Sequence, residues 1–313
     1  MPGTKEIRGK IASVKSTQKI TKAMQMMATS KMRRAQERMR RARPYAQKML
    51  NVIGHLTKAP GAMQWGQMVL ARGQRGAAAE GESESGKRAH RDLNLLRTDP
   101  KSVAIIVIST DRGLCGALNA NVFRRTLALI REWQSKGAEV SLCPLGKKGV
   151  NFFRRVKLPI LATLSPMGDW PHVKDLIGTV KVVTDGYRDG SLDCVLLVSS
   201  QFVSTMTQTP VVTQLLPLQT RDIEQLPEHW DYIYEPEPGA ILDTLAVRYI
   251  ESQVYRAAVE NVASEMAARM VAMKAATDNA SKLINELQLI YNKARQAAIT
   301  KEISEIVGGA AAV

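Results

Sequence analysis

Aromatic residues are scarce in this chain, since Phe, Trp and Tyr together make up 5% of the 313 residues. The chain is instead rich in Ala, Met and charged side chains, which fits long helices better than β-sandwiches. No stretch approaches the roughly 20 apolar residues that a membrane-spanning helix needs. The charged first residues are not followed by an apolar run, so we expect no secretory signal. These absences predict a helix-rich protein without a membrane span of its own.

Cysteine is equally rare, and none of the three residues, Cys115, Cys143 and Cys194, belongs to a CxxC pair. An odd number of widely spaced cysteines predicts free, buried thiols in a reducing setting. No group of His, Cys, Asp or Glu has metal-ligand spacing, and there is no GxSxG motif, P-loop or GxGxxG fingerprint. The sequence therefore predicts no metal and no cofactor.

Positive charge is concentrated in the first 58 residues. Between Lys5 and Lys58 there are 15 Lys and Arg residues against two acids, a net of +13 in a chain whose total is +15. Pro44 is the only proline between Thr4 and Gly54, so the segment reads as one helix with a single possible bend. At ~1.5 Å per residue this helix would be about 75 Å long.

Apolar and small residues in this segment recur at alternating spacings of four and three. The seam comprises Ile7, Ile11, Val14, Thr21, Ala28, Met32, Ala35, Met39, Ala42, Ala46, Met49, Ile53 and Leu56. A sustained 3.5-residue period predicts a left-handed coiled coil. The centre of the seam is polar at Gln18, Thr21 and Gln25. A second apolar line of Ile20, Met24 and Met27 runs beside it, so we expect the apolar stripe to be displaced there.

A second long helix is predicted from Gly239 to Val307, where no proline and no further glycine occurs. Its apolar stripe comprises Ile241, Leu245, Tyr255, Val259, Val262, Met266, Met273, Ala276, Ala280, Leu283, Leu287, Ile290, Ala294 and Ala297. The stripe is broken at Arg248, Ser252 and Arg269. This helix would be about 100 Å long at ~1.5 Å per residue. Two long helices at opposite ends of one chain most economically form an antiparallel coiled coil.

Apolar runs alternate with helical stretches between the two long helices. Strands are predicted at 103–109, 139–145, 158–164, 194–199 and 211–218, the last as an edge or hairpin strand. Helices are predicted at 119–136, 147–155 and 172–188. A continuous apolar run such as VAIIVIS is typical of a buried parallel strand. The alternation predicts an α/β layer.

The predicted fold class is α/β: a long antiparallel coiled coil of the N- and C-terminal helices plus a central α/β (Rossmann-like) domain with a mainly parallel sheet. The parts are a helix at 1–58, a connection at 59–101, the α/β domain at 102–220, a linker at 221–238 and a helix at 239–313. Within the connection, residues 71–91 are rich in Gly, Ala, Ser and charge, which predicts a flexible insertion.

The turn at 110–119 (TDRGLCGALN) follows a strand and opens a helix. Such a junction can hold a phosphate, but its GxxG spacing is a weak signal, and a tight structural turn is the simpler interpretation. Cys115 in this turn could act as a nucleophile only with a nearby base, and none of the four histidines has a telling local signature. An enzyme using this turn is one alternative function.

The arginine-rich stretch 33–43 suggests a nucleic-acid-binding coiled coil as another alternative. However, Tyr45 is the only aromatic residue in the first 58, and the basic residues surround the helix instead of forming one face. A surface facing solvent or an acidic protein is therefore favoured over nucleic acid.

Three blocks closely resemble one known family. They are KEIRGKIASVKSTQKITKAMQMMATSKM from residue 5, STDRGLCGALN from residue 109, and the C-terminal block from residue 251, which contains MVAMKAATDNASKLINELQLIYNKARQAAITKEISEIV. Together they resemble the gamma subunit of F-type ATP synthase in its bacterial form, over nearly the whole chain. The resemblance implies a non-catalytic central rotor shaft. This shaft couples proton-driven rotation of the c-ring to conformational changes at the beta-subunit catalytic sites.

The resemblance also implies partners and contact residues. The partners would be three alpha and three beta subunits, the epsilon subunit and the c-ring, with no nucleic acid and with the membrane met only through the complex. In this family the beta subunits carry acidic lever segments, here called the beta levers. Contacts with them would involve Lys19, Lys22, Met24 and Met27, with Arg295, Gln296 and Thr300 opposite. A foot facing epsilon and the c-ring would include Arg33, Arg40, Arg41, Tyr45, Phe202 and Thr205.

The chain departs from the family pattern in two places. The 59–101 connection is longer than is usual, and no two cysteines lie close enough for the regulatory thiol pair of chloroplast members. The cysteine pattern favours a bacterial member, peripheral on the cytoplasmic face of the inner membrane. A mitochondrial origin is the alternative.

Overall fold

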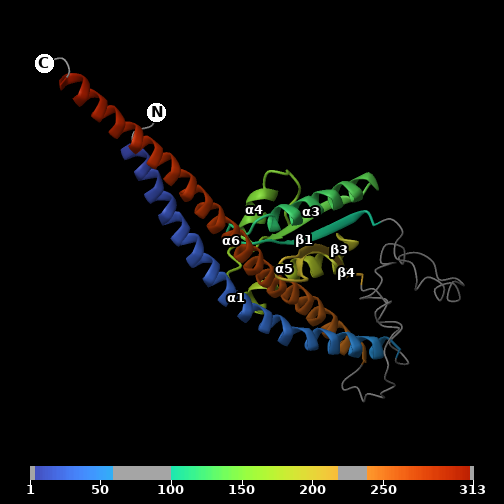
Figure 1. The fold of residues 1–313 in the computed structure, drawn as a ribbon. Helices are drawn as coiled ribbons and strands as arrows, with labels where there is room; N and C mark the ends of the chain where they lie inside the picture. Colours follow the sequence, from blue (N-terminus) through green and yellow to red (C-terminus); the bar gives the residue numbers. More distant parts are fainter. Residues whose placement is uncertain (1–3, 59–99, 218–237, 311–313) are drawn as a thin grey trace, which may run out of the picture.

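Two long helices lie side by side, with a smaller α/β domain on one flank (Figure 1). The computed structural model describes residues 4–58, 100–217 and 238–310. In chain order the elements are α1 (Thr4–Lys58), β1 (Ser102–Ile108), α3 (Leu118–Ser135), β2 (Glu139–Leu145), α4 (Lys147–Phe153), α5 (Val173–Asp189), β3 (Cys194–Phe202), β4 (Gln208–Leu216) and α6 (Pro238–Ala310). The predicted fold class is confirmed. The predicted connections 59–101 and 221–238 lie outside the described residues apart from their ends.

The heptad seam predicted for the first helix faces α6. Its buried members are Ile7, Thr21, Ala28, Met32, Ala35, Met39, Met49 and Ile53. The side chains of the seam residues Ala42, Ala46 and Leu56 lie outside the described part of the helix. The 3.5-residue period therefore predicted the buried face of α1 correctly, because a helix paired along its whole length must return the same stripe to its partner every seven residues.

The displaced apolar line predicted beside the seam is wrong. Ile20 and Met27 are 57% and 54% exposed, and the polar residues remain in the interface. Gln18 Nε2 donates to Ser281 Oγ over 2.7 Å, and the hydroxyls of Thr21 and Thr277 lie 2.7 Å apart. A buried polar group is tolerated when it is hydrogen-bonded, so the seam crosses this level as a polar layer and is not displaced.

From Leu245 to Ala280 the predicted stripe of the C-terminal helix is buried or half-buried, and beyond Ala280 it is only partly correct. The side chain of Ile241 lies outside the described part of the helix. Leu283 and Ile290 are 43% and 51% exposed, whereas Ile284 is buried. Ala297 is exposed as well. Leu287 and Ala294 are half-buried as predicted, whereas Ile284 and Tyr291 take the inward positions that were predicted for Leu283 and Ile290. Leu283 and Ile284 are both apolar, so only the contact with α1 distinguishes them.

The sheet has the strand order β2-β1-β3-β4, with the first three strands parallel and β4 antiparallel at the edge. One face packs on α3 and α4 through Val103, Ile105 and Val107 of β1. The other face packs on α5 and the shaft helices through Ala104, Ile106 and Ile108. Burial on both faces explains why β1 is apolar throughout. Helix α6 passes between this face and α1, which buries residues all around its middle.

The predicted strand at 158–164 is wrong. This segment makes only two isolated parallel bridges to β2, at Ile160 and Leu164. Pro159 has no N–H to donate, although its carbonyl accepts a 2.8 Å bond from Leu142 N. Without that donor the segment touches β2 but does not join the ladder.

Candidate functional site: an exposed coiled coil fixed to the edge of the sheet

The exposed coiled coil presents most of the predicted lever contacts to solvent. On α1, Lys19, Lys22 and Met27 are exposed and Met24 is half-buried. On α6, the side chains of Arg295, Gln296 and Thr300 are all exposed. The Thr300 hydroxyl donates to the Gln296 carbonyl over 2.9 Å, as is common on a helix.

These two sets of residues do not lie opposite each other. The pairing of Gln18 with Ser281 places Lys19 level with Ala280 or its neighbours on α6. Arg295 is about 15 residues further along that helix, which is ~22 Å at ~1.5 Å per residue. The predicted contacts therefore form two belts at different heights on the shaft, with the Arg295 belt close to the start of α1.

The residues predicted for the foot share one level lower on the shaft. Arg33, Arg40 and Arg41 are exposed on α1, and Phe202 and Thr205 are half-buried at the β3–β4 turn. The side chain of Tyr45 lies outside the described part of α1. Phe202 N donates to Glu260 Oε1 of α6 over 3.2 Å, which brings the turn to the side of the coil.

A buried ion pair within α6 lies just above this level, and its arginine joins the helix to the turn after β1. Arg269 Nη2 contacts Glu265 Oε1, and their side chains are only 10% and 7% exposed. The same nitrogen donates to the Gly113 carbonyl in the turn after β1 over 3.2 Å. Burial raises the pKa of the Glu265 carboxyl, and the adjacent guanidinium opposes this shift only in part. The pair thus carries a desolvation cost at the point where α6 crosses the carboxyl edge of the sheet.

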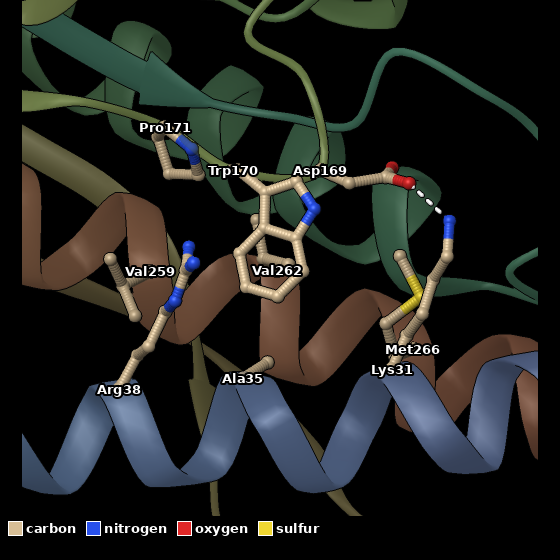
Figure 2. Close-up of a pocket in the computed structure, with 9 residues that line it drawn as sticks. All are labelled: Lys31, Ala35, Arg38, Asp169, Trp170, Pro171, Val259, Val262 and Met266. Atoms are coloured by element: carbon tan, nitrogen blue, oxygen red, sulfur yellow. Dashed lines mark hydrogen bonds and ion pairs between the residues drawn. The ribbon is translucent and has the colours of Figure 1, made fainter.

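The loop before α5 attaches α1 to the same edge (Figure 2). Lys31 forms an ion pair with Asp169, and the Arg38 guanidinium lies 3.4 Å from the centre of the Trp170 ring. Burial acts to raise the pKa of Asp169, but Lys31, with smaller contributions from Arg112 and Arg269, brings it below its ordinary value. A crevice between the two helices and the loop is also lined by Ala35, Pro171, Val259, Val262 and Met266.

Asp111 connects the two attachments. Its carboxylate accepts backbone N–H bonds from Lys147 over 2.9 Å, from Met167 over 2.9 Å and from Gly168 over 2.7 Å. The turn that meets Arg269 and the loop that meets Lys31 are therefore held to each other through one side chain. Charge-assisted bonds to backbone N–H groups are among the stronger hydrogen bonds of proteins.

The turn at 110–119 is closed by its own residues. Asn119 Nδ2 donates to Thr110 Oγ1 over 2.7 Å, and the Gly113 carbonyl is taken by Arg269. The interpretation as a tight structural turn is thus confirmed. Cys115 is 2% exposed, and burial raises the pKa of its thiol, which disfavours a nucleophilic role.

Of this network, the sequence signalled only Arg269, as a break in the apolar stripe. Asp111 belongs to the quoted turn, but nothing local reveals that its carboxylate meets a loop 56 residues away. Asp169 and Trp170 lie between predicted elements and carry no periodic signal.

Comparison with known proteins places the chain in a family. A family model described as ATP synthase matches residues 3–313. The chain belongs to this ATP synthase family. The match agrees with the resemblance to the gamma subunit found in the sequence. In the part of the chain that the structure describes, no helix has the length and apolar content to cross a bilayer.

Solved structures share the fold. A chain in the rotor of the Euglena gracilis mitochondrial ATP synthase, in rotational state 1, has a TM-score of 0.57 at 18% identity, covering 95% of this chain and 98% of that one. A chain in its OSCP/F1/c-ring structure, in state 3, has 0.61 at 18%, covering 99% and 94%. A chain in the central stalk and c-ring of the Tetrahymena thermophila mitochondrial ATP synthase has 0.54 at 24%, covering 82% and 99%. These likenesses confirm the predicted fold, and the family model agrees with the predicted membership of the ATP synthase.

Proposed function

We propose that the chain is the gamma subunit of a bacterial F-type ATP synthase and turns as its central shaft without carrying out catalysis itself. Its partners would be three alpha and three beta subunits around the coil, with the epsilon subunit and the c-ring at the foot. It would meet the membrane only through the complex, on the cytoplasmic face. The three buried free thiols support a member without redox regulation.

The observation that carries this proposal is the asymmetry of the exposed coil. Lys19 and Lys22 are exposed on α1, and Arg295 is exposed on α6 in the belt near the start of α1. A ring of beta subunits around such a shaft would meet a different set of side chains at each position. Each beta site then has a different nucleotide affinity, and rotation exchanges these states. This is coupling through differential contacts.

Co-purification tests the proposal. An affinity-tagged chain expressed in its host should arrive with alpha and beta subunits in a ratio of one to three to three, and with epsilon. The purified chain alone should not hydrolyse ATP. Recovery of a nucleic-acid complex without alpha and beta, whose affinity falls steeply with added salt, would instead indicate the nucleic-acid-binding alternative.

A further inference from the structure

The hydrogen bonds from α6 to the α/β domain lie between Glu260 and Arg269, and their partners in the domain are backbone atoms. Glu260 accepts from Phe202 N over 3.2 Å, Ser264 Oγ donates to the Ser200 carbonyl over 3.2 Å, and Arg269 donates to Gly113 O over 3.2 Å. Ser200 and Phe202 lie at the carboxyl end of β3, and Gly113 lies in the turn after β1. Backbone atoms at strand ends cannot swing as side chains do, so these bonds specify both the height and the rotation of α6 on the sheet.

Apolar packing alone would not specify this angle. The interface of α6 with the sheet is made of small and aliphatic side chains, among them Ala258, Val262 and Ala263. Burial of apolar surface is non-directional, so a helix with such a face can roll or slide at little cost. The polar contacts add direction, and the α1 contacts through Lys31 and Arg38 attach the second helix to the same edge.

The two attachments also form one charged cluster. Asp169 is held by Lys31 of α1, and the charge of Arg269 of α6 helps to lower its pKa. The negative charges of Asp169 and Asp111 in turn help to raise the pKa of Glu265. The cluster contains three cations and three anions: Lys31, Arg112, Arg269, Asp111, Asp169 and Glu265. Both helices are thus anchored to one balanced cluster, in which the Asp111 carboxylate holds the turn after β1 to the loop before α5.

We propose that Asp111, Asp169, Lys31, Glu265 and Arg269 form a torsional joint that passes rotation from the α/β domain to the coiled coil. The inference rests on the proposed function, because it assumes that torque enters through the domain. The five residues are positioning residues. They touch no substrate, and they fix the angle between the domain and the shaft.

A double variant separates this role from simple stability. Glu265→Met with Arg269→Met replaces the buried pair by apolar side chains of similar length, a change that is often neutral or stabilising. The complex should therefore assemble and hydrolyse ATP as the wild type does. The double variant lacks the hydrogen bond from Arg269 to the Gly113 carbonyl, so the number of protons pumped per ATP hydrolysed should fall severalfold. The distribution of resting angles between the α/β domain and the alpha and beta ring should also become wider.

The angle can be followed with a fluorophore on Lys181→Cys, an exposed position of α5, in complexes immobilised by their alpha and beta ring. Because the three native thiols of this chain are buried, the chain labelled before assembly carries the fluorophore at this site alone. Arg248→Met with Glu251→Met is the matched control: it also replaces both members of an ion pair within α6, so no unpaired charge remains buried, and it should leave the angle and the pumping unchanged. Wild-type pumping and a wild-type angular spread in the double variant would overturn the joint.

The α1 side offers a second test that does not depend on a buried residue. Lys31→Asp places two like charges together and should widen the angular spread, and adding Asp169→Lys should restore it. Failure of the exchange to restore the angle, with the complex assembled, would contradict the joint. Failure of wild-type chain to assemble with alpha and beta would contradict the proposed function instead.

Discussion

At the scale of single residues, the molecule carries charged side chains at buried positions, where loss of hydration costs free energy. Glu265 and Arg269 are almost fully buried, and Arg269 serves two acceptors with one nitrogen. Removing one member of a buried pair typically costs about 3–5 kcal/mol, because the other charge is left without a partner. The pair therefore makes the junction sensitive to single substitutions and tolerant of paired ones.

Arg269→Met should destabilise the chain by roughly 3–5 kcal/mol. It should also make stability dependent on pH, because the unpaired Glu265 carboxyl then has a raised pKa in the folded state. A folded state that binds the proton more tightly gains stability as pH falls from neutral towards the ordinary glutamate pKa of about 4.3. Thermal unfolding across this pH range measures the effect. Glu265→Gln in the same background should remove the added pH dependence, and a response of opposite sign would contradict the argument.

The thiols should be unreactive while the chain is folded. Burial raises the pKa of Cys143 to about 11 and that of Cys194 to about 12, so both are protonated at neutral pH. Since the thiolate is the reactive form, alkylation at pH 8 should be far slower than for an exposed cysteine. Mass spectrometry after iodoacetamide treatment, with and without denaturant, provides the measurement. Rapid labelling of either residue in the native protein would show that these strands open readily.

At the scale of elements, the coiled coil contains a polar layer instead of an unbroken apolar seam. Gln18 pairs with Ser281 and Thr21 with Thr277, which sets the antiparallel register to within one turn. A polar layer in a coiled-coil core commonly specifies alignment at some cost in stability. The exposed apolar residues beside it, Ile20 and Met27, lie on the outer surface of the shaft, where a partner would meet them.

Thr21→Val with Thr277→Val should leave stability unchanged or raise it by up to about 1 kcal/mol, because replacing both partners by groups of the same shape leaves no unsatisfied hydroxyl. Urea unfolding of the wild type and the double variant measures this difference. Serine at both positions is the matched control, since it keeps the hydroxyls and removes only methyl groups. A loss of several kcal/mol in the valine variant would mean that the polar layer holds the helices together and does not merely align them.

At the scale of the whole molecule, the shaft extends well beyond the domain that holds it, and α6 continues past the start of α1 (Figure 1). Arg295 lies near the point where the coil becomes a single helix. A guanidinium there can reach a partner without obstruction from α1. This position is consistent with the proposed contact between Arg295 and a beta lever.

Arg295→Ala should weaken the coupling of ATP hydrolysis to proton pumping more than it weakens folding or assembly. A charge-assisted hydrogen bond contributes about 1.5–3 kcal/mol, so the loss should be evident in ATP-driven acidification of inverted vesicles. Lys293→Ala removes a neighbouring exposed cation and should have little effect. Unchanged pumping in Arg295→Ala would remove this residue from the lever contacts.

Periodic features were predictable because each depends on residues close in sequence. The apolar run at β1, the strands at β2 and β3 and the seam of α1 follow from local alternation and heptad spacing. The segment 158–164 has a strand composition, yet Pro159 and its place at the sheet edge keep it out of the ladder. Leu283 and Ile284 are equally apolar, and only the presence of α1 selects the second.

Composition and periodicity alone were enough to specify a coiled coil built from the two ends of the chain, an α/β layer between them, and a strongly basic first helix. They were enough because each helix or strand has to bury an apolar face, and the spacing of its own apolar residues shows which face that is. The junction between shaft and sheet depends instead on Asp111, Asp169 and Arg269, which are brought together from three distant segments. Directional bonds between such residues exist only once the sheet and both helices are in place, so the folded structure alone reveals them.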